Sequence, residues 1–116
     1  HNSDDVASTM IFGSQWDAML NWMLTGSDAS KIFKVIGNHE GTPATTGKYG
    51  SDYINNIFDT SSNVRDLTQE ASNVSLRVYR GGGYGVNGNT VSSDRNASGT
   101  TLGSGLIGTR FTLYLK

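Results

Sequence analysis

The stretch "RVYRGGGYG", residues 77–85, places three consecutive glycines directly after an alternating β-branched and aromatic segment. A phosphate-binding loop would need a helix to begin after the glycines, so that backbone N–H groups and the helix dipole face the anion. The residues that follow, "VNGNT" at 86–90, are instead typical of a hairpin turn. The stretch therefore predicts a strand that ends in a glycine bend, and it argues against a phosphate site.

Alternating apolar residues predict strands on both sides of this bend. The residues expected to face the core are Val74, Leu76 and Val78 in residues 73–80, and Phe111, Leu113 and Leu115 in residues 108–116. Arg110 is expected on the outer face of the second of these strands. "NVRDLT", residues 63–68, predicts a shorter strand, whereas residues 91–105 are rich in Ser, Gly, Thr and Asn and predict a polar loop.

The segment "SQWDAMLNWMLTG", residues 14–26, predicts an amphipathic helix. Its apolar residues recur at helical spacing and share one face. They are Trp16, Met19, Leu20, Met23 and Leu24. Ser14 is expected to cap the N-terminus, with Asp17 three residues on, and Gly26 to end the helix in a left-handed conformation. We expect Trp16 to lie in the core and Trp22, at the edge of the stripe, to pack as well.

Residues 27–37 leave two alternatives open. They could form a short helix that is capped by Ser27 and ends at Gly37, or an extended run over residues 32–36. Residues 38–52 predict a long polar loop, and loops of that length inside a compact domain are often functional.

The chain as a whole predicts one α+β domain over residues 1–116. An N-terminal helix would pack on a small antiparallel sheet, with long polar loops above it. Because the chain begins without Met, we expect a processed product, an artificially trimmed chain or the C-terminal part of a longer protein.

Charge and composition exclude several functions. The formal net charge is −1, so no basic field is present to attract nucleic acid or an anionic membrane. No apolar run is long enough to span a bilayer. The chain contains no cysteine, which excludes disulfides, thiolate metal sites and cysteine nucleophiles. We therefore expect neither a nucleic-acid partner nor membrane insertion.

Several segments, taken in order, resemble the motifs of one family, the formylglycine-generating-enzyme-like domains. They are "GSQWDAMLNWML" at 13–24, "DYINNIFDTSSNVRDLT" at 52–68, "RVYRGGGY" at 77–84, "SSDRNAS" at 92–98 and "IGTRFTLYLK" at 107–116. The resemblance covers almost the whole chain and implies a C-type-lectin-like fold. The family includes oxygenases that make formylglycine, sulfoxide synthases and non-enzymatic binding domains.

The sequence departs from the enzymes of this family at decisive positions. It lacks the cysteines of formylglycine-generating enzymes, and its only histidines are His1 and His39, whereas sulfoxide synthases hold iron with three. Arg65 and Leu67 stand where the family motif has two tryptophans. The resemblance therefore implies the non-enzymatic branch, which contains the variable ligand-binding proteins of diversity-generating retroelements.

The function that we expect for this chain is the one that the non-enzymatic branch implies. Its members are found on phage tails and bacterial surfaces, so we expect an extracellular protein that binds a protein or glycan on a target cell without catalysis. If a parent protein is multimeric, the domain would act as an oligomer, and weak single contacts would be multiplied by avidity.

The same resemblance divides the glycine-rich stretch into scaffold and ligand surface. Gly81 and Gly82 match a glycine pair where the strand bends and backbones approach closely. Arg77 and Arg80 match framework arginines that tie loop carbonyls to the sheet. The stretch beyond corresponds to the ligand-facing surface, and its Tyr, Ser and Asn suit an adaptable binding surface. The expected ligand-binding residues are Tyr79, Tyr84, Asn87, Asn89, Ser92, Ser93, Asp94 and Asn96.

Calcium is the one metal that the sequence suggests. Asn63 and Asp66 lie in a stretch rich in Asp and Asn, whose oxygens suit calcium. Some relatives in the resembled family hold calcium near the equivalent positions. Arg65 next door would oppose a cation, and the alternative is that Asp66 pairs with an arginine.

Two other functional classes stay open. A metal-dependent enzyme of the same fold would have relocated its catalytic groups, with His39 and either Asp52 or Asp59 as candidates. A structural oligomerisation module would use its loops to bind only neighbouring subunits.

Overall fold

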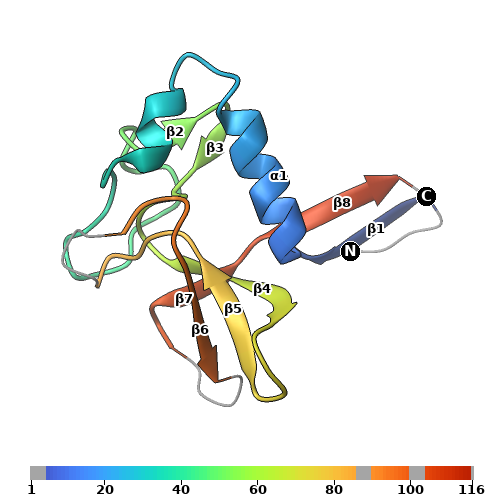
Figure 1. The fold of residues 1–116 in the computed structure, drawn as a ribbon. Coiled ribbons are helices and arrows are strands. Elements are labelled where there is room, and N and C mark those ends of the chain that lie inside the picture. Colours follow the sequence, from blue (N-terminus) through green and yellow to red (C-terminus); the bar gives the residue numbers. More distant parts are fainter. Residues whose placement is uncertain (1–4, 86–89, 100–103, 116) are drawn as a thin grey trace.

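The computed structural model describes residues 5–85, 90–99 and 104–115, and it confirms the expected α+β class. One α-helix and one 3₁₀ helix lie among short strands (Figure 1). The elements are β1 (Val6–Met10), α1 (Gly13–Met23), η1 (Ala29–Phe33), β2 (Tyr53–Ile54), β3 (Ile57–Phe58), β4 (Arg65–Ala71), β5 (Leu76–Arg80), β6 (Arg95–Gly99), β7 (Ile107–Thr109) and β8 (Phe111–Leu115).

The main sheet has four strands in the order β6-β5-β4-β7. The pairs β4–β5 and β5–β6 are antiparallel, but β7 runs parallel to β4, so the sheet is mixed and the expectation of a purely antiparallel sheet was wrong. β2 and β3 form a small separate hairpin, and β1 pairs with β8 as a two-stranded ribbon. Figure 1 shows this ribbon extending away from the rest of the domain.

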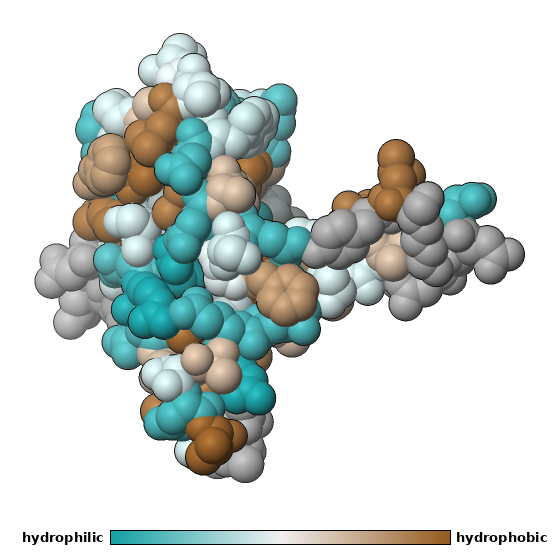
Figure 2. All heavy atoms as spheres, turned by 45° about the vertical axis from the view of Figure 1, so that its right-hand side comes forward, coloured by the Kyte–Doolittle hydropathy of each residue, from teal (hydrophilic) through white to brown (hydrophobic). Residues whose placement is uncertain are grey.

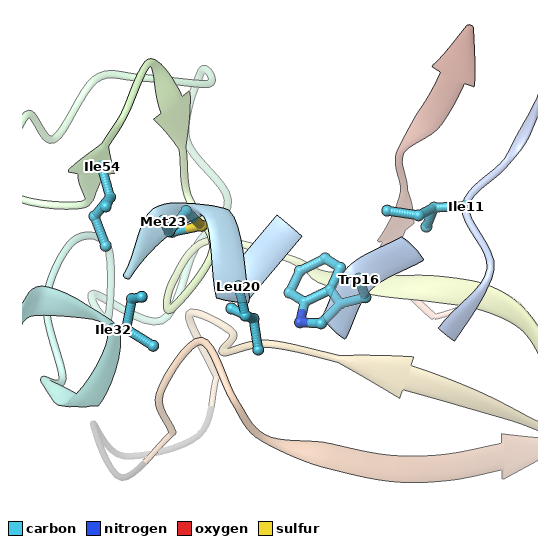
Figure 3. Packing of buried hydrophobic residues seen from close by; sticks show 6 residues of the cluster. All are labelled: Ile11, Trp16, Leu20, Met23, Ile32 and Ile54. Atoms are coloured by element: carbon cyan, nitrogen blue, oxygen red, sulfur yellow. The ribbon is translucent and has the colours of Figure 1, made fainter. Parts of the chain in front are cut away.

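The core lies along one face of α1. Trp16, Leu20 and Met23 recur at helical spacing and are buried, as the sequence predicts. Figure 3 shows them in one cluster with three isoleucines from other parts of the chain. Those isoleucines are Ile11, Ile32 and Ile54. The indole N–H of Trp16 donates a hydrogen bond to the Ser92 carbonyl oxygen at 3.1 Å, so this buried ring has no unpaired donor.

Two apolar residues at the end of α1 lie outside this core. Trp22 is 50 % exposed and Leu24 is 44 % exposed, so the expectation that both pack was wrong. The helix ends at Met23 and the chain turns there. The apolar stripe therefore extends beyond the part of the helix that the rest of the fold covers.

The helix ends differ from those expected. The helix begins at Gly13, and the Phe12 N–H donates to Oε1 of Gln15 at 2.8 Å, so Ser14 lies inside the helix and caps nothing. Asp17 pairs with an arginine of the sheet instead of serving the helix N-terminus. Gly26 is not among the residues with positive φ, so the expected left-handed helix end was also wrong.

Residues 27–37 combine parts of both open alternatives. They contain the short 3₁₀ helix η1, and the backbone is extended at Lys34, with φ −110° and ψ 145°. Residues 38–52 contain neither helix nor strand, which confirms the predicted loop.

The strands predicted over residues 63–68, 73–80 and 108–116 overlap β4, β5 and the pair β7 and β8, but residues 91–105 contain strand β6, so the prediction of a polar loop there was wrong. The facing of the predicted strands was also partly wrong. Val78 is fully buried as expected, but Val74 is 100 % exposed because it lies in the turn before β5. Phe111, Leu113 and Leu115 were expected to face the core and are instead 69 %, 72 % and 90 % exposed. Alternation shows which side chains share a face of a strand, but not what covers that face.

Candidate ligand-binding site

The chain crosses itself at Gly81 and Gly82, directly after β5. Gly81 has a φ of +76°, a left-handed conformation that residues with a side chain rarely adopt. A Cβ atom on Gly81 would lie 2.3 Å from the carbonyl oxygen of Thr60, and one on Gly82 would lie 1.7 Å from that of Ser61. The Gly82 N–H donates to the Thr60 oxygen at 3.2 Å. The expected bend and close backbone approach are therefore confirmed.

The segment that crosses the glycines, residues 59–63, is held by the carboxylate of Asp52. Asp52 is fully buried, and its Oδ2 accepts hydrogen bonds from the Ser61 N–H at 2.9 Å, the Ser61 hydroxyl at 3.1 Å and the Ser62 hydroxyl at 2.7 Å. The backbone is left-handed at the first and last residues of the segment, with φ of +56° and +62°. These residues are Asp and Asn, which tolerate that conformation best among residues with side chains.

Asn63 joins this segment to the long loop of residues 38–52. Its Oδ1 accepts hydrogen bonds from Nδ2 of Asn38 at 3.2 Å and from the Ala44 N–H at 2.8 Å. Its Nδ2 donates to the Ala44 carbonyl oxygen at 2.8 Å. Asn63 is buried, so these bonds satisfy an amide that water does not reach. The loop is thus tied to the crossing by side-chain bonds.

Arg110 ties the carbonyls at the end of β3 to the sheet. Its Nε donates to Oδ2 of Asp66 at 2.5 Å, and its Nη2 donates to the carbonyl oxygens of Phe58 and Asp59 at 2.7 and 2.9 Å. The planar guanidinium suits this use because its donors are fixed in a fork. The expectation that Arg110 faces outward from its strand was therefore wrong.

Of the two arginines expected to tie loop carbonyls to the sheet, only one does so. Arg80 donates to Oδ1 of Asp17 at 2.6 Å, and so links the sheet to α1. Arg77 donates to the carbonyl oxygens of Asn73 and Leu76 at 3.5 and 3.3 Å, both within its own hairpin. The assignment was wrong for Arg80, which α1 covers, whereas Arg77 does tie one loop carbonyl, that of Asn73, to the sheet.

The two residues suggested for calcium, Asn63 and Asp66, line one cavity of about 140 Å³ together with Asp59. Asn63 Oδ1 and Asp66 Oδ2 both accept the hydrogen bonds described above. Within the described ranges, no three His, Cys, Asp or Glu side chains are grouped so that they could hold a metal. Asp66 thus has the arginine partner that was the alternative to a calcium site. The calcium site itself stays a prediction.

Burial raises the pKa of Asp66 above its ordinary value of 3.8, although the charge of Arg110 opposes this shift. A carboxyl group with a raised folded-state pKa binds more protons when folded, so stability is lost as pH rises from 3.8 through the folded pKa. We expect the unfolding free energy of the wild type, relative to Asp66→Asn, to fall over that interval in urea titrations. A rise would show that Arg110 outweighs burial, and would contradict this expectation.

A polar cavity of about 250 Å³ lies beside the crossing, where β5 ends and β6 begins. Tyr79 and Asn96 are register partners across these strands. The Gly81 N–H donates to the Asp94 carbonyl oxygen at 3.0 Å, which fixes the entry to β6. Arg65, at the start of β4, lies over Tyr79 with its Cζ 4.9 Å from the ring centroid. The lining residues are Arg65, Tyr79, Gly81, Thr90, Asp94, Arg95 and Asn96.

The two arginines of the cavity differ in their partners. Arg95 forms an ion pair with Glu70, and the hydrogen bond that Arg95 donates to the Glu70 carboxylate raises the pKa of Arg95. Arg65 lies over the face of Tyr79, in a cation–π arrangement. Among the residues that the structure describes, no carboxylate forms a salt bridge with Arg65 and no cation forms one with Asp94. The cavity therefore offers a ligand one positive and one negative group.

The structure brings three of the expected ligand-binding residues together in this cavity: Tyr79, Asp94 and Asn96. Ser93 is exposed beside Asp94. Asn87 and Asn89 lie outside the described residues.

Two other expected residues serve the framework. Ser92 is fully buried, with its Oγ 2.7 Å from Oγ1 of Thr60, so its side chain does not reach the ligand surface and that expectation was wrong. Tyr84 is half-buried, and its hydroxyl donates to the Gly105 carbonyl oxygen at 3.0 Å. Its own carbonyl oxygen accepts from the Gly41 N–H at 3.2 Å, which holds part of the loop of residues 38–52 close to the segment after the glycines.

The ligand surface was expected over residues 79–96, but Thr90 and Arg95 were not singled out within it, and Arg65 was missed altogether. Arg65 could have been found by pairing the predicted strand at 63–68 with the strand that ends at residue 80. That pairing places Asp66 opposite Arg80 and brings Arg65 to the glycine bend. Arg95 could not have been found in this way, because β6 has a sequence typical of a loop.

The candidates for an enzymatic site make contacts of their own. His39 Nε2 lies 3.1 Å from the Ile36 carbonyl oxygen, and its buried Nδ1 has no hydrogen-bond partner among the residues that the structure describes. Asp52 is occupied by the hydroxyl and amide donors described above, and Asp59 Oδ2 accepts from the Gly47 N–H at 3.1 Å. These contacts favour no catalytic pair.

Comparisons with protein-family models, curated proteins and solved structures find no match to this chain. The family resemblance and the fold name that it implies therefore stay predictions. No helix in residues 5–85, 90–99 and 104–115 has both the length and the apolar character needed to cross a membrane.

Proposed function

We propose that this chain is a ligand-binding domain with a C-type-lectin-like fold, and that the cavity between β4, β5 and β6 is its binding site. The observation that carries the proposal is the grouping of Tyr79, Asp94 and Asn96 with two arginines in one polar cavity. Three residues that were selected for their binding chemistry thus meet at one place. The family resemblance supports the fold name and a location on a bacterial surface or phage particle.

The chemistry of the lining favours a glycan that carries an acidic group. Arg65 can form a bidentate pair with a carboxylate, which is the geometry that a guanidinium recognises best. Asp94 accepts hydrogen bonds from sugar hydroxyls, and Asn96 both donates and accepts them. Tyr79 adds a rigid aromatic wall. A few polar groups that converge on a small cavity give orientation and specificity to a ligand of this kind.

The proposal is tested by a binding screen of the labelled chain on immobilised glycans. The array pairs glycans that end in uronic or sialic acids with neutral glycans of otherwise similar structure. We expect retention on acidic glycans, with weaker binding at high salt because ion pairing at an open cavity is screened. Retention on neutral glycans only, or on no glycan, would contradict the proposal.

The cavity residues can be tested on any glycan that the screen selects. We expect Arg65→Gln to weaken binding about 10-fold or more, which corresponds to about 1.4 kcal/mol for a lost charge-assisted pair. Tyr79→Ala should weaken it further because the aromatic wall is lost. Val74→Ala is the matched control, since Val74 is fully exposed in the turn before β5. Calorimetric titration would contradict the assignment if Arg65→Gln and Val74→Ala bound equally well.

A further inference from the structure

The ribbon of β1 and β8 presents an apolar face outside the core. The register places Met10 opposite Phe111, Ser8 opposite Leu113 and Val6 opposite Leu115. Directly opposite residues in an antiparallel pair share a face, so these side chains lie on one side of the ribbon. Figure 2 shows hydrophobic side chains on the part of the molecule that projects from the body.

This face is unusually apolar for an exposed surface. Phe111, Leu113 and Leu115 are 69 %, 72 % and 90 % exposed. Neither strand contains a charged residue, since they read "VASTM" and "FTLYL". Exposed edge and ribbon strands usually carry charges, especially lysine, that prevent association. A two-stranded ribbon is also marginally stable alone and needs a packing partner on its apolar face.

We propose that the partner is a second copy of this chain, which packs its own ribbon face to face against the first in a two-fold dimer. A two-fold interface joins the same patch on both chains, so the patch must be compatible with itself. A face without charges meets this requirement, because no like charges oppose one another when two copies meet. An acidic or basic partner would find no complementary charge on these strands.

The area of the face is consistent with a small dimer interface. At ~150 to 200 Å² for each large side chain, the exposed parts of Phe111, Leu113 and Leu115 amount to roughly 400 Å². Two copies would therefore bury roughly 800 Å² from these side chains alone. This area is below the ~1,200 Å² at which stable specific interfaces begin, so the dimer is a weak one that forms at high protein concentration. The dimer would carry two ligand cavities, although the inference does not depend on what they bind.

The inference is tested by the mass of the intact chain in solution. We expect sedimentation equilibrium at about 100 µM, a concentration that favours a small interface, to give twice the 12.4 kDa of one chain. Leu113→Lys should raise the dissociation constant at least about 10-fold, because it places like charges opposite one another in the dimer. Val74→Lys is the control, since it adds the same charge at a fully exposed apolar residue outside the ribbon. A monomeric wild type, or a dimer that Leu113→Lys leaves intact, overturns the inference.

A second measurement does not depend on how well the lysine variant folds. The chain has no cysteine, so Leu113→Cys supplies a single thiol in the middle of the face. We expect mild oxidation to cross-link this variant into a covalent dimer, and to leave Val74→Cys largely monomeric. Equal cross-linking of the two variants, or none for Leu113→Cys, overturns the inference.

Discussion

Gly82→Ala is expected to destabilise the fold by roughly 4 kcal/mol or more, which is enough to unfold many domains of this size. The new Cβ would lie 1.7 Å from the carbonyl oxygen of Ser61 and 2.3 Å from its carbonyl carbon. Both atoms belong to the backbone, so no side-chain rotation relieves the overlap. The crossing would have to open, and the buried hydrogen bonds of residues 59–63 would open with it.

Gly50→Ala is the matched control for this prediction. No atom of the described part of the chain lies within 4 Å of a Cβ atom on Gly50, and its φ is not in the left-handed region. Alanine at such a position restricts the unfolded chain and stabilises the fold by about 0.4 to 1 kcal/mol. Urea denaturation compares the two variants directly. Equal stability of Gly82→Ala and the wild type would mean that the backbones do not cross as described.

Asp52→Ala is expected to cost roughly 3 to 5 kcal/mol, because it leaves several buried donors without an acceptor. Oδ2 of Asp52 accepts from the amide and hydroxyl of Ser61 and from the hydroxyl of Ser62, and all three residues are fully buried. Asp52→Asn should cost less, since one amide oxygen can replace Oδ2. Thermal unfolding should therefore rank the wild type above Asp52→Asn, and Asp52→Ala last.

Asp28→Ala tests whether the large loss of stability expected for Asp52→Ala is caused by the burial of Asp52. Asp28 pairs with Lys31 at 3.2 Å, but its side chain is 44 % exposed, and exposed pairs contribute about 0 to 1 kcal/mol. The two substitutions remove the same group from opposite environments. If Asp28→Ala and Asp52→Ala lowered the melting temperature equally, the account of residues 59–63 as a segment fixed by buried hydrogen bonds would be wrong.

The sequence predicted best where one local pattern decides the outcome. The stripe of Trp16, Leu20 and Met23 follows from helical spacing, and all three are buried. The bend at Gly81 and Gly82 follows from the glycines themselves, since they open conformations that other residues avoid. The loop over residues 38–52 was also predicted, because turn-forming residues dominate it.

Prediction failed where an outcome depends on a distant part of the chain. Strand β6 has a sequence typical of a loop and is a strand because the edge of β5 supplies its hydrogen bonds. Ser92 is polar and lies in a polar stretch, yet it is buried. Its carbonyl oxygen accepts a hydrogen bond from Trp16, and its hydroxyl is hydrogen-bonded to that of Thr60. Leu113 has an ideal alternating pattern, but its strand pairs with β1 outside the main sheet. The local sequence pattern does not show which distant segments of the chain pair with one another.

In the candidate site, too, some residues were predicted from local sequence and others depend on how distant strands pair. Tyr79, Asp94 and Asn96 were selected by residue type and by the resemblance to binding domains, and they share one cavity. Arg65, whose charge no described carboxylate pairs with, comes from a neighbouring strand whose register the sequence does not state. The acidic ligand is therefore an inference that needed the structure.

The proposed function requires that a ligand bind in the cavity lined by Arg65, Tyr79 and Asp94. The most direct test is to titrate the ¹⁵N-labelled chain with an oligosaccharide that ends in glucuronic acid and to map the amide shifts. The account predicts that the shifts concentrate at Arg65, Tyr79 and residues 94–96, and that the amides of α1 and of the β1–β8 ribbon stay in place. Shifts that cluster at the ribbon or at the end of α1, or no shifts at millimolar ligand, would contradict it.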